Sequence, residues 1–333
     1  MFIVQSYSVA VVLCIITMLC WGSWGNTLKL ASKTWRYEYF YWDYVIGVLL
    51  FSIISGLTLG SIGHEGRSFI NDLMQASASS LGSAFLGGII FNASNILLSA
   101  AIAVCGMSVA FPVGVGLALV LGVIINYFGA AKGEPAFIFL GVILISIAIL
   151  LNGLAYSKAL KGSQKVSTKG ILLSLSAGII MAFFYRFVVA SMDMNDFAAP
   201  AAGKLTPYSA VFIFSVGVFL SNFIFNTFAM KHPVEGKPAK ISGYFHGEFK
   251  THIVGILGGL IWCLGQSFSM LASEKAGAAI SYGLGQGATL VSALWGILIW
   301  KEFKDAPKQS TYLNLGMFIL FTIGLGFLIY AGA

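Results

Sequence analysis

Long apolar segments alternate with short polar ones along the whole chain. Ten of the apolar segments reach about 20 residues, the length that an α-helix needs to cross the hydrocarbon core of a bilayer. They lie at residues 8–28, 40–60, 81–104, 107–128, 136–156, 170–190, 207–230, 252–272, 277–300 and 311–332. The segments lack the alternation of barrel strands, which favours helices. The pattern therefore predicts an all-α polytopic membrane protein with ten transmembrane helices.

Composition narrows the class of protein. Of the 333 residues, 58% are hydrophobic and 9% are charged, whereas soluble domains carry about 25% charged residues. This excludes a soluble enzyme and a disordered chain. It also argues against a nucleic-acid partner, because the net charge of +7 is concentrated in a few loops.

No motif for a metal, a cofactor or enzymatic chemistry is visible. The four cysteines lie inside apolar segments, without the paired spacing of a zinc site. The sequence contains no nucleophile–base arrangement, no H-E-x-x-H motif and no complete dinucleotide fingerprint. We therefore expect neither a cofactor, nor a metal, nor an enzyme.

The basic residues predict the orientation in the membrane. The loops after the first, fifth, seventh and ninth spans hold 14 Lys and Arg residues, and the loops on the opposite side hold 4. Because cytoplasmic loops retain positive charge, we expect both termini outside and the 157–169 loop in the cytoplasm. The predicted location is the cell (inner) membrane, crossed many times.

An internal repeat predicts the architecture. A shift of 171 residues aligns 86–128 with 257–299 without a gap, and ten positions are identical, five of them glycines. The shift carries the third span onto the eighth and the fourth onto the ninth. An odd offset of five spans inverts one half relative to the other, as in many secondary transporters. The sequence thus predicts two inverted five-helix repeats, 1–160 and 161–333.

Four segments resemble a known group of transporters. They are Cys20-Trp21-Gly22-Ser23, Tyr41-Trp42-Asp43-Tyr44, the run from Gly106 to Gly122, and the run from Ala276 to Phe303. Together with the ten spans they are similar to the drug/metabolite transporter superfamily, in particular its ureide permease, glucose/ribose porter and rhamnose–proton symporter group. The resemblance implies an inverted-repeat fold and uptake of small neutral polar solutes, often with protons. One departure is the short 157–169 loop, which lacks the phosphate-binding glycine motif of plant ureide permeases.

Polar and aromatic residues inside the spans are the candidate substrate-binding residues, because a polar side chain in lipid needs a partner or a water-filled cavity. Amides offer donors and acceptors together, and aromatic rings offer a stacking face. Asn95 of the third span stands opposite Gln266 in the repeat. The candidates are Asn92, Asn95, Trp262, Gln266, Tyr282, Gln286, Trp21, Trp24 and Asn26. Hydrogen bonds between helices or rings facing lipid are the alternative explanation.

Four residues are candidates for coupling or gating. Asp43, near the cytoplasmic end of the second span, either carries a proton or lies at headgroup level within an aromatic belt. Arg186 either snorkels or closes an outer gate, and Glu274 lies at the outer turn between the eighth and ninth spans. Pro112 interrupts the fourth span, where a broken helix marks a binding site or a simple packing face.

These features predict a secondary active transporter that works by alternating access. The expected substrate is a small neutral polar solute, first a monosaccharide, then a ureide or nucleobase-like heterocycle, taken up with a proton or sodium ion. An exporter of drugs or amphipathic metabolites on the same fold is the alternative, while a membrane enzyme, a lipid scramblase and a sensor are more distant ones. The expected partners are the substrate, the coupling ion and the lipid bilayer, with the protein a monomer or a homodimer.

Overall fold

The computed structural model confirms the ten predicted spans. It describes residues 1–32, 34–63, 65–159, 167–234, 236–301, 303–304 and 306–333. Over these residues the chain is helical without a strand, and ten helical segments are long and apolar enough to cross a membrane. Their ends agree with the predicted ends to within four residues. The chain is therefore a multi-pass α-helical membrane protein.

Seven spans are single helices and three are composite. The first span combines α1 (Tyr7–Ser23) with α2 (Gly25–Ala31). The next two are α3 (Tyr37–Leu57) and α5 (Ala78–Cys105). The fourth combines α6 (Met107–Ala110), η1 (Phe111–Val115) and α7 (Gly116–Gly129). The fifth to eighth are α8 (Pro135–Ala159), α9 (Thr168–Ser191), α10 (Pro207–Lys231) and α12 (Phe249–Ala276). The ninth combines α13 (Ala278–Gln286), α14 (Ala288–Leu294) and η2 (Trp295–Ile299), and α15 (Lys308–Tyr330) is the tenth.

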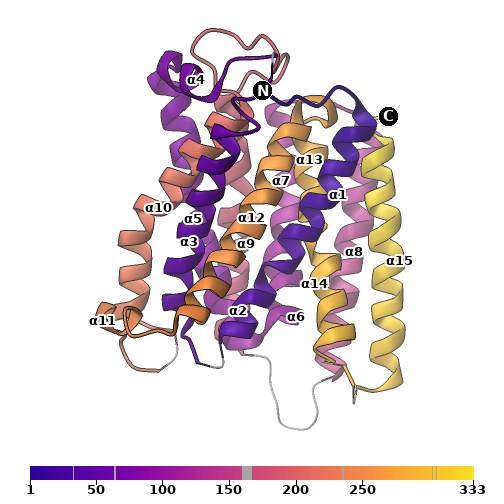
Figure 1. The fold of residues 1–333 in the computed structure, drawn as a ribbon. Coiled ribbons are helices and arrows are strands. Elements are labelled where there is room, and N and C mark those ends of the chain that lie inside the picture. The colour runs from indigo at the N-terminus through magenta and orange to yellow at the C-terminus, as the bar shows by residue number, and fades with distance from the viewer. Residues whose placement is uncertain (33, 64, 160–166, 235, 302, 305) are drawn as a thin grey trace.

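The two ends of the bundle differ in their connections. Both termini lie at one end, together with the short helix α4 (Phe69–Gln75), and we call this the terminal end (Figure 1). The short helix α11 (Ile241–Tyr244) lies at the opposite end, which we call the α11 end (Figure 1). Residues 160–166 of the predicted cytoplasmic loop lie outside the described residues.

Glycines bring pairs of helices into backbone contact. α12 packs on α3, and α5 packs on α10. A Cβ added to Gly259 would lie 2.0 Å from the carbonyl oxygen of Tyr44, and one added to Gly88 would lie 2.1 Å from that of Phe214. Small residues at such crossings allow the close approach on which helix association in lipid depends.

Two glycines end the long central helices in the same manner. Gly106 follows α5 with φ of 78°, and Gly277 follows α12 with φ of 84°. Residues with a side chain rarely adopt this left-handed region, so glycine is the natural choice for reversing the chain here. The helices that follow are both irregular: Pro112 lies in the π-helical turn η1, and Gly287 separates α13 from α14. Such irregular turns are frequent at functional sites.

Candidate functional site

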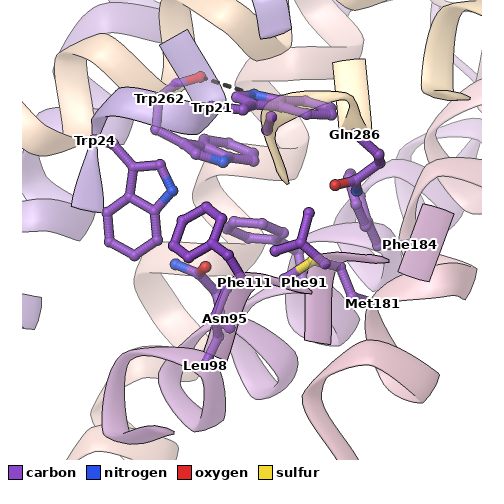
Figure 2. A pocket seen from close by; sticks show the side chains of 12 residues that line it. Trp21, Trp24, Phe91, Asn95, Leu98, Phe111, Met181, Phe184, Trp262 and Gln286 are labelled. Atoms are coloured by element: carbon purple, nitrogen blue, oxygen red, sulfur yellow. Dashed lines mark hydrogen bonds between the residues drawn. The ribbon is translucent and has the colours of Figure 1, made fainter. Parts of the chain in front are cut away.

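A cavity in the middle of the bundle is the candidate binding site (Figure 2). Six aromatic residues form most of its wall: Trp21, Trp24, Phe91, Phe111, Phe184 and Trp262. The remaining lining residues are Asn95, Leu98, Val115, Met181, Gln286 and Ala288. We call this the central cavity. None of the lining residues that the structure describes is charged.

The irregular helices supply part of the wall. Phe111 and Val115 belong to the π-helical turn η1, while Gln286 and Ala288 flank the break at Gly287. The rest of the wall comes from the first span and from α5, α9 and α12. Both broken spans therefore meet at the cavity, together with four spans from different parts of the sequence.

The rings of the central cavity touch one another. Trp21 and Trp262 are stacked, with centroids 5.8 Å apart and planes 7° from parallel. The indole of Trp21 also donates a hydrogen bond to the backbone carbonyl of Trp262 at 3.2 Å. The ring of Phe91 lies 4.1 Å from that of Trp262. Because aromatic side chains are rigid and amphipathic, these rings can stack on a planar heterocycle or on the C–H face of a sugar.

The cavity is closed in this conformation. The space that the centre of a water molecule can occupy is about 20 Å³. That is room for about one water. A larger solute can enter only if the surrounding rings move apart.

One amide of the cavity belongs to a buried hydrogen-bond chain. Asn95 donates to the hydroxyl of Tyr41 at 3.2 Å, and this hydroxyl donates to the side-chain oxygen of Asn92 at 3.0 Å. Asn92 in turn donates to the hydroxyl of Ser221 at 2.9 Å. The chain runs from the cavity wall through α3 and α5 to α10, and it orients the Asn95 amide.

A second cavity lies one helical turn nearer the α11 end. We call it the α11-end vestibule. It has a volume of about 440 Å³, and its lining includes Leu28, Ile102 and Met107. Each of these is four residues from a residue of the central cavity, namely Trp24, Leu98 and Phe111, and four residues make about one turn. On these three spans the walls of the two cavities are therefore about one helical turn apart.

Toward the terminal end, aromatic rings and hydroxyl groups pack together beyond the cavity. The ring of Tyr185 lies 5.1 Å from that of Tyr282, beyond the cavity residue Phe184. The Tyr185 hydroxyl also contacts the hydroxyls of Ser269 and Ser281 at 2.9 and 3.0 Å. This hydrogen-bonded layer joins α9, α12 and α13.

The structure brings five of the nine predicted substrate residues to the central cavity: Trp21, Trp24, Asn95, Trp262 and Gln286. The other four lie elsewhere. Asn92 and Gln266 are fully buried outside the lining, and neither amide atom of Gln266 has a hydrogen-bond partner. The Tyr282 hydroxyl donates to the carbonyl of Ala118 at 3.2 Å, and Asn26 accepts from the indole of Trp300 at 2.7 Å.

Most of the remaining lining residues could not be recognised from the sequence. Phe91, Leu98, Met181 and Phe184 are apolar residues within apolar spans, and nothing in the pattern separates them from residues that face lipid. Only Phe111 carried a signal, because the repeat places it opposite Tyr282.

Asp43 is buried among protein side chains at the α11 end. Its side chain is 1% exposed. One carboxylate oxygen accepts hydrogen bonds from the Tyr244 hydroxyl at 2.6 Å and from Nδ1 of His252 at 2.8 Å. The ring of Trp35 stands edge-on to His252 at 5.0 Å. α3, α11 and α12 thus enclose a carboxylate–imidazole pair at the α11 end.

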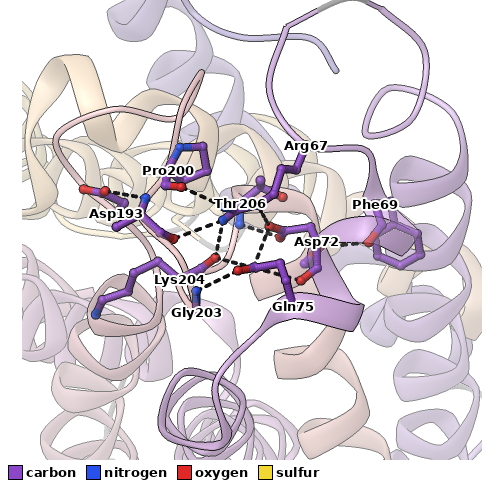
Figure 3. A network of polar contacts seen from close by, with 11 residues as sticks. Arg67, Phe69, Asp72, Gln75, Asp193, Pro200, Gly203, Lys204 and Thr206 are labelled. Carbon is purple, nitrogen blue, oxygen red and sulfur yellow. Dashed lines mark hydrogen bonds and ion pairs between the residues drawn. The ribbon is translucent and has the colours of Figure 1, made fainter.

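A polar network at the terminal end joins α4 to the loop between α9 and α10 (Figure 3). Arg67 donates to Asp72 at 2.9 Å and to the carbonyl of Pro200 at 2.7 Å. The other carboxylate oxygen of Asp72 accepts from the backbone of Thr206 at 2.7 Å. The network links residues that are more than 130 positions apart, so it fixes the loops of this end to each other.

The two remaining candidates also lie at the terminal end. Glu274 accepts a hydrogen bond from the backbone of Phe197 at 3.1 Å and pairs with Lys275. Arg186 and Asp193 both line a surface depression of about 480 Å³. Backbone hydrogen bonds from Ala201 hold the pKa of Asp193 below its ordinary value.

Comparison with known proteins gives a consistent picture. The sequence profile of the family described as ureide permease matches residues 40–165 and 151–331. Ureide permease 1 of Arabidopsis thaliana is 24% identical over 383 aligned positions, which cover 98% of both chains. A probable glucose uptake protein of Bacillus cereus is 25% identical, covering 66% of this chain and 68% of that protein. A solved crystal structure, 14% identical, matches the fold with a TM-score of 0.55 over 96% of this chain and 98% of the other.

Proposed function

The chain belongs to the ureide permease family and is thus a membrane transporter of small solutes, and we propose that it is a secondary active importer. The proposed substrate is a small neutral polar solute, and the proposed driving force is a proton gradient. In this proposal the protein lies in the cell membrane with the α11 end in the cytoplasm, because the basic loops gather at that end.

The composition of the central cavity is the observation that carries this proposal. Two amides, Asn95 and Gln286, stand among aromatic rings, and no charged side chain lines the wall. Amides can pair with sugar hydroxyls or with the N–H and C=O groups of a ureide, while the rings stack on the ligand's flat face. We place monosaccharides first, and ureides or oxo-heterocycles second.

Alternating access between two inverted halves is the proposed mechanism. Its support is the equivalence of the glycine crossings: Gly88 meets Gly217 where α5 crosses α10, and Gly259 meets Gly47 where α12 crosses α3. Gly88 and Gly259 are aligned by the repeat. Halves that pack by the same contacts can rock against each other around a central site.

The α11-end vestibule suggests which gate opens first from this conformation. Its lining residues Leu28, Ile102 and Met107 lie about one helical turn from residues of the central cavity. The hydrogen-bonded layer around Tyr185 closes the terminal end. We therefore propose that solute leaves the closed state through the vestibule, toward the cytoplasm.

A second candidate function is export of amphipathic compounds. Ten of the twelve lining residues of the central cavity are apolar, and the amides Asn92 and Gln266 do not reach it. A mostly apolar cavity would suit such a cargo. The two functions differ in ligand chemistry, so one binding assay can separate them.

Ligand-dependent thermal stabilisation of the detergent-purified protein tests the proposal. A ligand at ten times its Kd stabilises the folded state by about 1.4 kcal/mol. The panel contains hexoses, pentoses, allantoin, uracil and lipophilic cations, and each hit proceeds to exchange and uptake in proteoliposomes. Asn95→Leu should abolish stabilisation by the hit. Asn152→Leu is the matched control, because Asn152 is a buried amide that bonds Asn314 away from the cavity. Stabilisation by lipophilic cations alone would instead favour export.

A further inference from the structure

The buried pair of Asp43 and His252 takes no part in the wall of the central cavity. Asp43 projects from the second turn of α3, and His252 from the first turn of α12. Their contact at 2.8 Å joins helices that also meet at the crossing of Gly47 and Gly259. Burying ionisable side chains in a membrane span costs free energy. The presence of this pair therefore indicates a functional role.

Few other groups that could bear charge face this pair. From α11 comes the Tyr244 hydroxyl, whose pKa is raised by burial and by its hydrogen bond to Asp43, so that it keeps its proton and donates it. On the first turn of α3, Glu38 is already paired with Arg36 at 2.8 Å. α10 presents the neutral amide of Asn226, which bonds the Glu38 carbonyl.

The other elements near α3 add no countercharge to the pair. α5 contributes the amides Asn92 and Asn95, which bond Tyr41. Lys29 of α2 lies over the ring of Trp300 at 4.3 Å. The lysines of the α11-end loop, Lys240 and Lys250, are exposed. Among the described residues, the pair therefore depends on its own proton for neutrality.

The number of protons on the pair sets its net charge. With one proton shared between carboxylate and imidazole, the pair is neutral overall. After that proton leaves, the imidazole is neutral and the carboxylate keeps a negative charge. Its second oxygen has no hydrogen-bond partner. A buried charge without a countercharge is unfavourable even where it keeps hydrogen bonds, so loss of the proton favours a conformation in which water reaches Asp43.

The pair is mechanically connected to the central cavity. Asp43 precedes Tyr44, whose ring lies 5.0 Å from that of the cavity residue Trp24. A Cβ on Gly255 would lie 2.4 Å from that of Asp43, and Gly255 is seven residues from Trp262, about 10 Å along α12. Movement of α3 against α12 at the pair therefore reaches the cavity wall.

We propose that Asp43 and His252 form the binding site of the coupling proton, with the protonated pair holding the α11 end closed and proton release allowing it to open. The inference rests on the proposed function as a proton-driven transporter. It assigns to Tyr244 and Trp35 the role of enclosing the pair.

Transport in proteoliposomes tests this site with two assays on each variant. Exchange measures movement of labelled solute without a gradient, and accumulation measures uptake against its own gradient under an imposed pH difference. One proton per solute drives about tenfold accumulation per pH unit. For Asp43→Asn we expect exchange to persist without dependence on pH, and accumulation to disappear. Glu248→Gln and His246→Gln are the matched controls, since both residues lie in the same exposed stretch between α11 and α12, and both variants should accumulate like wild type.

The outcomes separate the two proposals. Accumulation by Asp43→Asn at the wild-type ratio would overturn the proton site and leave the transporter proposal intact. Absence of exchange by the wild type with every solute of the panel would overturn the proposed substrate class.

A fluorescence titration, which needs no solute, tests the pair even if no solute of the panel is exchanged. Protonated imidazole quenches indole fluorescence, and the ring of Trp35 contacts His252. The fluorescence of wild type minus that of Trp35→Phe reports on Trp35 alone, and we expect this difference to show one transition with pH. Asp43→Asn should displace that transition, and His252→Gln should remove it. If either Asp43→Asn or His252→Gln folds and shows the wild-type transition unchanged, the proposal is overturned.

Discussion

A single methyl group at the crossing of α3 and α12 should disturb the whole bundle. In Gly259→Ala the new Cβ would lie 2.0 Å from the carbonyl oxygen of Tyr44 and 2.7 Å from the amide nitrogen of Val48. Ordinary contact begins near 3.4 Å, so the two backbones must separate by about 1.4 Å at this point. Both neighbours are backbone atoms, which cannot move away by a change of rotamer as a side chain can.

Overpacking of this kind costs about 1–3 kcal/mol. The assay is thermal or denaturant unfolding of the detergent-purified protein, followed by exchange in proteoliposomes. Gly153→Ala is the matched control, because a Cβ at that position of α8 meets nothing within 4 Å. Gly88→Ala should cost as much as Gly259→Ala, since its Cβ would lie 2.1 Å from the Phe214 carbonyl. Equal stability of Gly259→Ala and Gly153→Ala would refute the reasoning.

Three further predictions concern the gates and the loops. Met107→Ala should join the central cavity to the α11-end vestibule, raising the exchange rate while lowering stability by about 2–5 kcal/mol; an unchanged rate would contradict the assigned barrier. Arg67→Gln leaves the fully buried carboxylate of Asp72 without its cation and should cost about 1–3 kcal/mol in unfolding experiments, whereas exposed Lys237→Gln should cost nothing measurable. Asp193 has a depressed pKa in the folded state, so its contribution to stability exists above the unfolded pKa of about 3.9 and is lost as the pH falls through the folded value. Melting curves of wild type and Asp193→Asn should therefore converge in acid, and a constant difference at all pH values would refute this assignment.

The spans were predictable because they follow from length and hydropathy alone. A membrane span must satisfy its backbone within one helix, so twenty apolar residues leave little choice of structure. The repeat aligned Gly106 with Gly277, and the structure shows why glycine stands at both positions, because few other residues accept the φ values found there.

The site was only partly predictable, because a sequence gives the height of a residue along its helix better than the direction it faces. The repeat places Asn95 opposite Gln266, yet only Asn95 lines the central cavity. On α12 the residue that reaches the cavity is Trp262, one turn earlier. For Asp43 the sequence left a proton-carrying role and a position at headgroup level open, and it did not show that Tyr244 and His252, from segments about 200 residues later, bond its carboxylate. Helix rotation and loop placement depend on tertiary packing that no local pattern records.

The small volume of the central cavity has a consequence for the membrane itself. The cavity has room for about one water, so a continuous file of water molecules along which protons could move does not fit between its rings. Under the proposed proton coupling, this conformation conserves the proton gradient between transport cycles, and a solute that separates the rings must itself fill the space between them.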